Sequence, residues 1–166
     1  FVASIVFLYL IARRYIGVIT AQIAVFTSAF LPFNIFFSRT TLPEPTFIFF
    51  GLGMLYFMDR WIFEGKRSLA IWGGIFTTVA FLIKPWAIFF FLPLFYNLYR
   101  KGDKKIFFKK FLPLTVISLV PFIAWRVWIS QHPEGIPAST WLYNAGNIRL
   151  RPAFFWWLLS ERLGRE

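Results

Sequence analysis

Long apolar runs constrain the fold of this chain more than any other feature of its sequence. Ile16–Phe37 contains 22 consecutive residues without an Asp, Glu, Lys or Arg. A helix needs about 20 mostly apolar residues to cross the hydrocarbon core of a bilayer, so this run predicts a membrane-spanning helix. Two further apolar runs predict spans, Thr46–Phe63 with Asp59 and Arg60 close to its far end, and Phe111–Ser130 with Arg126 near its far end. Apolar residues that come in blocks, without a strand-like or amphipathic alternation, are typical of a helical membrane protein.

The composition disfavours a soluble protein. Hydrophobic residues make up 58% of the chain and charged residues 15%, whereas a soluble domain carries about 25% charged residues. The net charge of +11 would suggest nucleic-acid binding in a soluble protein. Here the basic residues lie between apolar blocks, a distribution typical of membrane topology, and we expect no nucleic-acid partner.

Leu69–Tyr99 is too long for one membrane helix. As a single helix it would extend for about 46 Å, whereas the hydrocarbon core is ~30 Å thick. Lys84-Pro85 interrupts it near the middle. We therefore predict a hairpin with two short arms, Leu69–Ile83 and Trp86–Leu98, whose break lies in a protein-lined or watery recess or where the bilayer thins. Phe1–Ala12 is also too short to span, and we expect it to be the end of a helix from a longer protein.

The resulting prediction is an all-α, polytopic transmembrane bundle with about six membrane segments in residues 1–130. Its basic clusters, Arg13-Arg14, Lys66-Arg67 and Arg100–Lys110, then fall on one side of the membrane. An excess of Lys and Arg marks the cytoplasmic side. The hairpin therefore brings Arg39, Glu44 and Lys84 to the opposite, external face.

Residues 131–166 form the second predicted region, an external loop with a C-terminal interfacial helix. Pro152–Leu163 is only about a dozen residues long, too short to span, and it is rich in Phe and Trp. Tryptophan is enriched at membrane interfaces, which predicts a helix lying along the surface. His132 is the only histidine and the chain has no cysteine. We therefore expect no metal site.

The run Phe37–Pro45 interrupts two apolar blocks and places charged residues at the expected membrane edge. Pro43 and Pro45 keep Glu44 out of a continuous helix, and Pro45 suits the first position of the next one. Glu44 would then lie at the N-terminal end of that helix, where the dipole favours an anion. Ionisable residues at a membrane boundary suggest a functional site. The alternative is an interfacial loop with one helix cap.

Arg39, Glu44 and Lys84 form the candidate site. Two cations suit a phosphate or pyrophosphate, because Arg offers a planar fork of donors and Lys a point charge. The carboxylate of Glu44 would orient or deprotonate an acceptor hydroxyl. The structural alternatives are a snorkelling Lys84 at a helix end and a salt bridge between Arg39 and Glu44.

Two short motifs carry a resemblance to a known family. Ser38–Pro45, which opens a membrane helix, is followed about forty residues later by Phe81-Leu82-Ile83-Lys84-Pro85, after Gly73-Gly74. This pattern resembles the integral-membrane glycosyltransferases of the GT-C type, and most closely family 39, which includes protein O-mannosyltransferases and the lipid A aminoarabinose transferase. In that family an Arg and an acidic residue follow about the third membrane helix, and a Lys motif ends a later short helix. The resemblance covers about Ile16–Arg100.

The resemblance implies an enzyme of the cell membrane that transfers a sugar, with inversion, from a polyprenyl-phosphate donor to a protein or glycolipid acceptor outside the cytoplasm. Glu44 would be catalytic, Arg39 and Lys84 would bind the donor phosphate, and no other cofactor is implied. The chain departs from the family pattern in two respects. Glu44 stands where many members have Asp. The principal acidic residue of the family lies in the first external loop, between its first two membrane helices, and we expect this chain to begin after that loop. We therefore expect the isolated chain to be inactive.

Two other functional classes remain open from the sequence. A transporter or flippase for a lipid-linked or anionic substrate would use the same broken hairpin and the same cations. A non-catalytic membrane assembly subunit would tolerate replacement of Arg39, Glu44 and Lys84.

Overall fold

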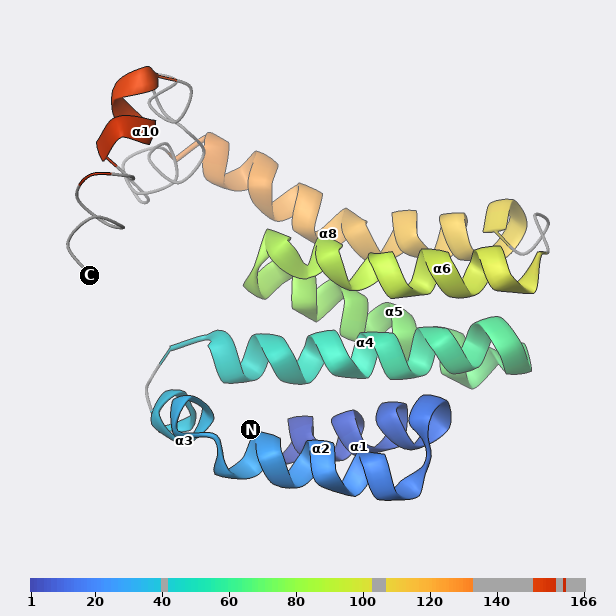
Figure 1. The fold of residues 1–166 in the computed structure, drawn as a ribbon. Helices are drawn as coiled ribbons and strands as arrows, with labels where there is room; N and C mark the ends of the chain where they lie inside the picture. The colour runs from blue at the N-terminus through green and yellow to red at the C-terminus, as the bar shows by residue number, and fades with distance from the viewer. Residues whose placement is uncertain (40–41, 103–106, 133–150, 158–159, 161–166) are drawn as a thin grey trace. The chain divides into compact units, whose positions relative to one another are not determined.

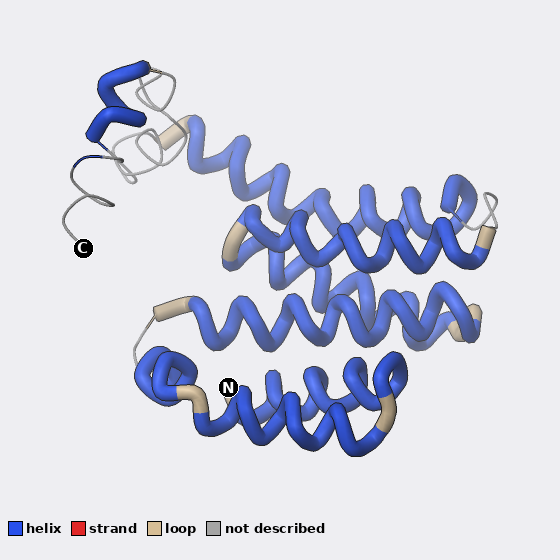
Figure 2. The backbone as a smooth tube through the Cα atoms, in the orientation of Figure 1, coloured by secondary structure: helices blue, strands red, loops and turns tan. Residues whose placement is uncertain are grey.

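The computed structural model describes residues 1–39, 42–102, 107–132, 151–157 and 160. Over these residues every regular element is a helix, which confirms the all-α prediction (Figures 1 and 2). The chain divides into two compact units, Phe1–Trp125 and Arg126–Glu166. The candidate site lies in the first unit.

The N-terminal helices form an antiparallel pair that ends in a kink. Helix α1 (Val2–Ile16) is joined to α2 (Val18–Phe30) through Gly17 (Figure 1), whose φ of 88° favours glycine. Helix α3 (Pro32–Ser38) follows directly and is bent by 61° from α2. Pro32 causes this interruption and begins α3, because proline fits the first turn of a helix but not its interior.

Helix α4 (Glu44–Glu64) is the centre of the first unit and packs against α1, α5 and α6. Pro43 is its N-cap residue and Pro45 lies in its first turn. Glu44 is therefore at the N-terminal end of α4, as predicted from the positions of Pro43 and Pro45. The helix ends at Gly65, which adopts a left-handed conformation with a φ of 72°.

The predicted hairpin is confirmed. Helix α5 (Arg67–Ile83) stops at Lys84, whose extended backbone (φ −149°, ψ 129°) is the conformation that a following proline favours. A short 3₁₀ helix, η1 (Pro85–Phe90), leads into α6 (Phe91–Lys101). In Figure 1, α6 runs opposite to α5 and parallel to α4.

The remaining described helices are η2 (Phe107–Phe111), a π-helical turn, then α8 (Leu112–Ser130) and α10 (Pro152–Trp157). The predicted surface helix over Pro152–Leu163 is thus helical as far as Trp157. Residues 158–159 and 161–163 of that segment lie outside the described part of the chain. Its location at a membrane surface remains a prediction.

The prediction of about six membrane segments needs correction. By length and composition, α4 and the continuous helical stretch Phe107–Ser130 can cross a membrane, and the bent pair α2–α3 makes a third if it is one span. Helix α5 is apolar but has 17 residues, which rise about 25 Å and fall short of a ~30 Å core. The second hairpin arm is divided between η1 and α6. Each predicted segment is helical, but half of them are too short to count as complete spans.

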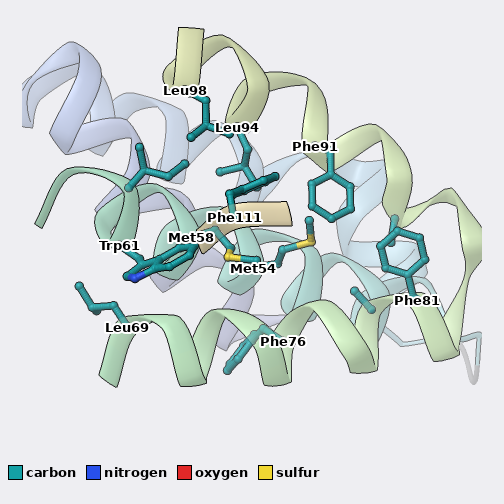
Figure 3. Packing of buried hydrophobic residues seen from close by; sticks show 13 residues of the cluster. Met54, Met58, Trp61, Leu69, Phe76, Phe81, Phe91, Leu94, Leu98 and Phe111 are labelled. Atoms are coloured by element: carbon teal, nitrogen blue, oxygen red, sulfur yellow. The ribbon is translucent and has the colours of Figure 1, made fainter. Parts of the chain in front are cut away.

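Aromatic and sulfur-containing side chains fill the space between α4, α5 and α6 (Figure 3). Met54 and Met58 of α4 are fully buried, as are Ala80 of α5 and Leu94 of α6. Each of these helices therefore contributes to one continuous core. This packing holds α4 and α5 against each other.

The two glycines of α4, Gly51 and Gly53, leave no room for a side chain. An added Cβ at Gly53 would lie 2.1 Å from a ring carbon of Phe76, and one at Gly51 would lie 2.2 Å from the Phe90 ring. Aromatic rings, and not a facing backbone, occupy the space that the glycines leave.

We expect Gly53→Ala to destabilise the protein by about 1–3 kcal/mol, because overpacking forces a buried ring to move. Thermal unfolding in detergent would measure the change. Gly73→Ala is the control, since its nearest contact is the flexible Met58 side chain at 3.0 Å. Equal melting temperatures for the two variants would contradict the packing at Gly53.

Candidate functional site

The structure brings Glu44 and Lys84 together across 40 residues of sequence. The Lys84 ammonium donates a hydrogen bond to Glu44 Oε1 and forms an ion pair with it. Both side chains are partly buried, with exposed fractions of 28% for Lys84 and 37% for Glu44. The pair results from two local proline effects, one that starts α4 at Glu44 and one that ends α5 at Lys84.

The second carboxylate oxygen of Glu44 has a different environment. Oε2 is buried and has no hydrogen-bond partner among the described residues. Buried polar atoms in folded proteins are nearly always hydrogen-bonded, so an unpaired one calls for an explanation. The first turn of α4 favours the ionised carboxylate through the helix dipole. Glu44 thus has one oxygen held by a cation and one oxygen that lacks a donor.

Arg39 is separate from this pair in the described structure. It is exposed at the C-terminal end of α3, next to Pro32, Ile35 and Phe36, and forms no ion pair with another described residue. The salt bridge considered between Arg39 and Glu44 is therefore not the one that forms. Glu44 pairs with Lys84 instead. That Arg39 and Lys84 share one phosphate remains a prediction.

A cavity of about 170 Å³ adjoins Glu44 on the side of α1 and α3. Its walls are mostly apolar, with Ile5, Leu8, Phe33 and Phe37 among the lining residues. The polar residues of its wall are Ser4, Ser28, Asn34, Ser38 and Glu44. Of this group, sequence reasoning identified Glu44 as a site residue and placed Ser38 in the motif that leads to it. Ser4, Ser28 and Asn34 carry no local pattern and meet only when the helices pack.

A second polar cluster, also missed from the sequence, lies towards the other end of α4. The Tyr15 hydroxyl donates to Asp59 Oδ1, and the Asn97 amide donates to the same oxygen at 2.9 Å and to the Tyr15 hydroxyl at 2.7 Å. Arg14 Nε lies 2.9 Å from Asp59 Oδ2. We call Arg14, Tyr15, Asp59 and Asn97 the Asp59 network. It connects α1, α4 and α6.

The ion pairs also test how the basic clusters are grouped. Arg14 and Lys66 both pair with Glu64, and the Lys101 ammonium donates to the carbonyl of Ile62. Residues from all three basic clusters therefore gather at the C-terminal end of α4, whereas Lys84 pairs with Glu44 at its N-terminal end. This is the division that the predicted topology requires.

The chain matches the model of a known protein family. The model of the dolichyl-phosphate-mannose-protein mannosyltransferase family matches residues 1–128, which include the Glu44–Lys84 pair and the Asp59 network. Neither the curated proteins nor the solved structures contain a match. The match covers most of the 166 residues and agrees with the resemblance carried by the Ser38–Pro45 and Phe81–Pro85 motifs. The chain therefore belongs to the dolichyl-phosphate-mannose-protein mannosyltransferase family, a family of membrane glycosyltransferases.

Proposed function

We propose that this chain is part of an enzyme that transfers a sugar from a polyprenyl-phosphate donor to a hydroxyl acceptor on the non-cytoplasmic side of the cell membrane. The family supports a lipid-linked sugar donor and a membrane setting. The observation that carries the proposal is the Glu44–Lys84 pair, a carboxylate and an ammonium held together at the N-terminal end of α4.

In the proposed reaction, Lys84 binds the donor phosphate, and Arg39 adds a second cationic contact. The acceptor oxygen forms a bond to the anomeric carbon of the sugar while the bond from that carbon to the phosphate oxygen breaks. The phosphate leaves with the electron pair, stabilised by the cations. Glu44 takes the proton of the acceptor hydroxyl. The family match favours this reaction over a transporter and over a purely structural subunit.

The proposed sidedness gives a labelling prediction. Leu42 and Lys66 flank the two ends of α4, and both are exposed. Leu42→Cys should react with a membrane-impermeant maleimide added to intact cells, whereas Lys66→Cys should react only after the cells are permeabilised. The chain contains no cysteine that would add background. External labelling of Lys66→Cys together with protection of Leu42→Cys would show that the protein has the opposite orientation in the membrane.

The proposed role of Lys84 is tested by titrating the donor. We expect Lys84→Ala to raise the KM for a polyprenyl-phosphate sugar about 10- to 100-fold in the full-length enzyme, as expected for losing one charge-assisted hydrogen bond. The turnover number should change less, because the phosphate contact already exists in the donor complex.

Lys84→Arg and Lys66→Ala are the controls for this experiment. Lys84→Arg keeps the cation and should recover part of the donor affinity. Lys66→Ala removes a lysine that pairs with Glu64 at the other end of α4 and should leave the donor KM unchanged. If the donor KM of Lys84→Ala equals that of the unaltered enzyme, Lys84 does not bind the donor phosphate.

A further inference from the structure

A pocket with a cationic wall lies at the C-terminal end of α4, away from the Glu44–Lys84 pair at the N-terminal end. Its volume is about 230 Å³, larger than the ~150 Å³ cavity that accepts a benzene-sized molecule, so a phosphate group has room there. Residues 61–65 at the end of α4 form one part of its wall, and Lys101 of α6 and Lys110 of η2 form the other. Figure 1 shows the C-terminal ends of α4 and α6 at the same end of the first unit.

Lys101 is held in position and still has donors for a ligand. Its ammonium donates a hydrogen bond to the carbonyl of Ile62 and lies 5.8 Å from the centre of the Phe63 ring. A lysine ammonium has three N–H donors, and within the described part of the chain the Ile62 carbonyl takes one of them. That carbonyl belongs to the last turn of α4, whose partial negative charge would otherwise oppose an anion. Lys101 offsets this charge and keeps two donors for an anion in the pocket.

The other charges of the wall leave the pocket cationic. Lys110 is exposed and has no hydrogen bond or ion pair with another described residue. Glu64 is the one carboxylate among the lining residues, and it is already paired with Arg60 and Lys66. Lys101 and Lys110 are therefore two lining cations without a described counter-ion, and charge-assisted hydrogen bonds from both would stabilise a phosphate.

We propose that this pocket binds the phosphate headgroup of an anionic phospholipid, a site that goes beyond the sugar transfer proposed above and does not depend on it. The phosphate accepts hydrogen bonds from Lys101 and Lys110, and the glycerol lies against Phe63, which is 40% exposed. Helix α4 is long enough to cross a membrane, and a spanning helix places its last turn at the level of the headgroups. Basic pockets between membrane helices bind anionic lipid headgroups at this level.

Native mass spectrometry of the full-length protein, titrated with a phosphatidylglycerol, tests the site. The titration is made in about 1 M ammonium acetate, where the Debye length of ~3 Å suppresses attraction by cations that do not contact the lipid. We expect Lys110→Ala to lower the association constant about tenfold, the effect of one charge-assisted hydrogen bond. Lys101→Ala should have a similar effect. Lys110→Ala is the cleaner variant, because its side chain is exposed and loses no described partner.

Lys109→Ala is the matched control. Lys109 precedes Lys110 in η2 and is also exposed, but it does not line the pocket. Its replacement should change the association constant by about twofold at most, since a screened cation contributes only where it touches the lipid. Equal losses for Lys109→Ala and Lys110→Ala would overturn the proposal, because a diffuse basic surface would then account for the binding.

Three further ligands distinguish the lipid from other sources of phosphate. A phosphatidylcholine with the same acyl chains should bind about tenfold more weakly, because its headgroup has no net charge. Equal affinity for it would overturn the proposal. Displacement of the phosphatidylglycerol by excess inorganic phosphate would identify free phosphate as the ligand, and equally strong binding of a polyprenyl phosphate that is lost in Lys110→Ala would identify the donor lipid. Lys84→Ala should leave the affinity for phosphatidylglycerol unchanged, so this result is independent of the proposed reaction.

Discussion

Glu44→Gln is expected to lower the turnover number of the full-length enzyme by about 10²- to 10⁴-fold, the usual contribution of a general base. Glutamine has nearly the same shape and still offers an oxygen that accepts a hydrogen bond from Lys84. It has no negative charge, however, and cannot take the proton of the acceptor hydroxyl. Transfer from a polyprenyl-phosphate sugar would be measured with the donor at saturating concentration, so that the chemical step is compared and not the affinity.

A carboxylate at the far end of the same helix provides the control. Glu64 pairs with Arg60 and Lys66, and Glu64→Gln should leave turnover unchanged. The donor KM of Glu44→Gln should remain within a few-fold of the unaltered value, because Lys84 stays in place to bind the phosphate. Turnover of Glu44→Gln equal to that of Glu64→Gln would exclude Glu44 as the general base.

Asp59→Ala is expected to reduce the free energy of unfolding by about 3–5 kcal/mol, as when one partner of a buried ion pair is removed. Asp59 is 6% exposed and is the acceptor for Tyr15, Asn97 and Arg14. Without it, Arg14 retains only its longer, 3.8 Å ion pair with Glu64, and the two neutral donors, Tyr15 and Asn97, lose a buried acceptor. A protein of this size should then melt about 6–20 °C lower.

Thermal unfolding in detergent would test the Asp59 network. Glu64→Gln again serves as the control, because the ion pairs of Glu64 are more exposed and such pairs contribute about 0–1 kcal/mol each. If Asp59→Ala and Glu64→Gln melt at the same temperature, the network does not hold α1, α4 and α6 together. Activity is not needed for this measurement, so it is independent of the proposed reaction.

Proline explains why several features of the fold could be predicted from the sequence. Pro32, Pro43, Pro45 and Pro85 act on the one or two residues beside them, so their effects on helix ends can be inferred without knowledge of the packing. The kink, the start of α4 and the reversal after Lys84 all follow from this local effect. Those helix ends bear Glu44 and Lys84, so the sequence predicted that the two residues share one face, but the salt bridge it considered for Glu44 was with Arg39.

The features that the sequence did not predict depend on packing between helices. Ser4 and Asn97 are single polar residues in apolar or mixed surroundings, with no spacing that identifies a partner. Their neighbours come from other helices, 82 residues away for the bond between Asn97 and Tyr15. The number of complete spans was overestimated for a related reason. Apolar composition indicates which segments enter a membrane, but helix ends set by proline decide how long each helix is.

The short helix α5 has a consequence for the lipid that surrounds the protein. Its 17 residues reach about 5 Å less than the thickness of the hydrocarbon core. A bilayer can accommodate such a helix by becoming locally thinner, one of the two placements predicted for the break at Lys84, at a cost of only a fraction of a kcal/mol per Å. Headgroups beside Lys84 would then lie closer to the bilayer midplane than they do elsewhere. A polyprenyl phosphate could thus diffuse laterally into contact with the ammonium while its chain stays among the other acyl chains, so loading the enzyme would not require extracting the donor from the membrane.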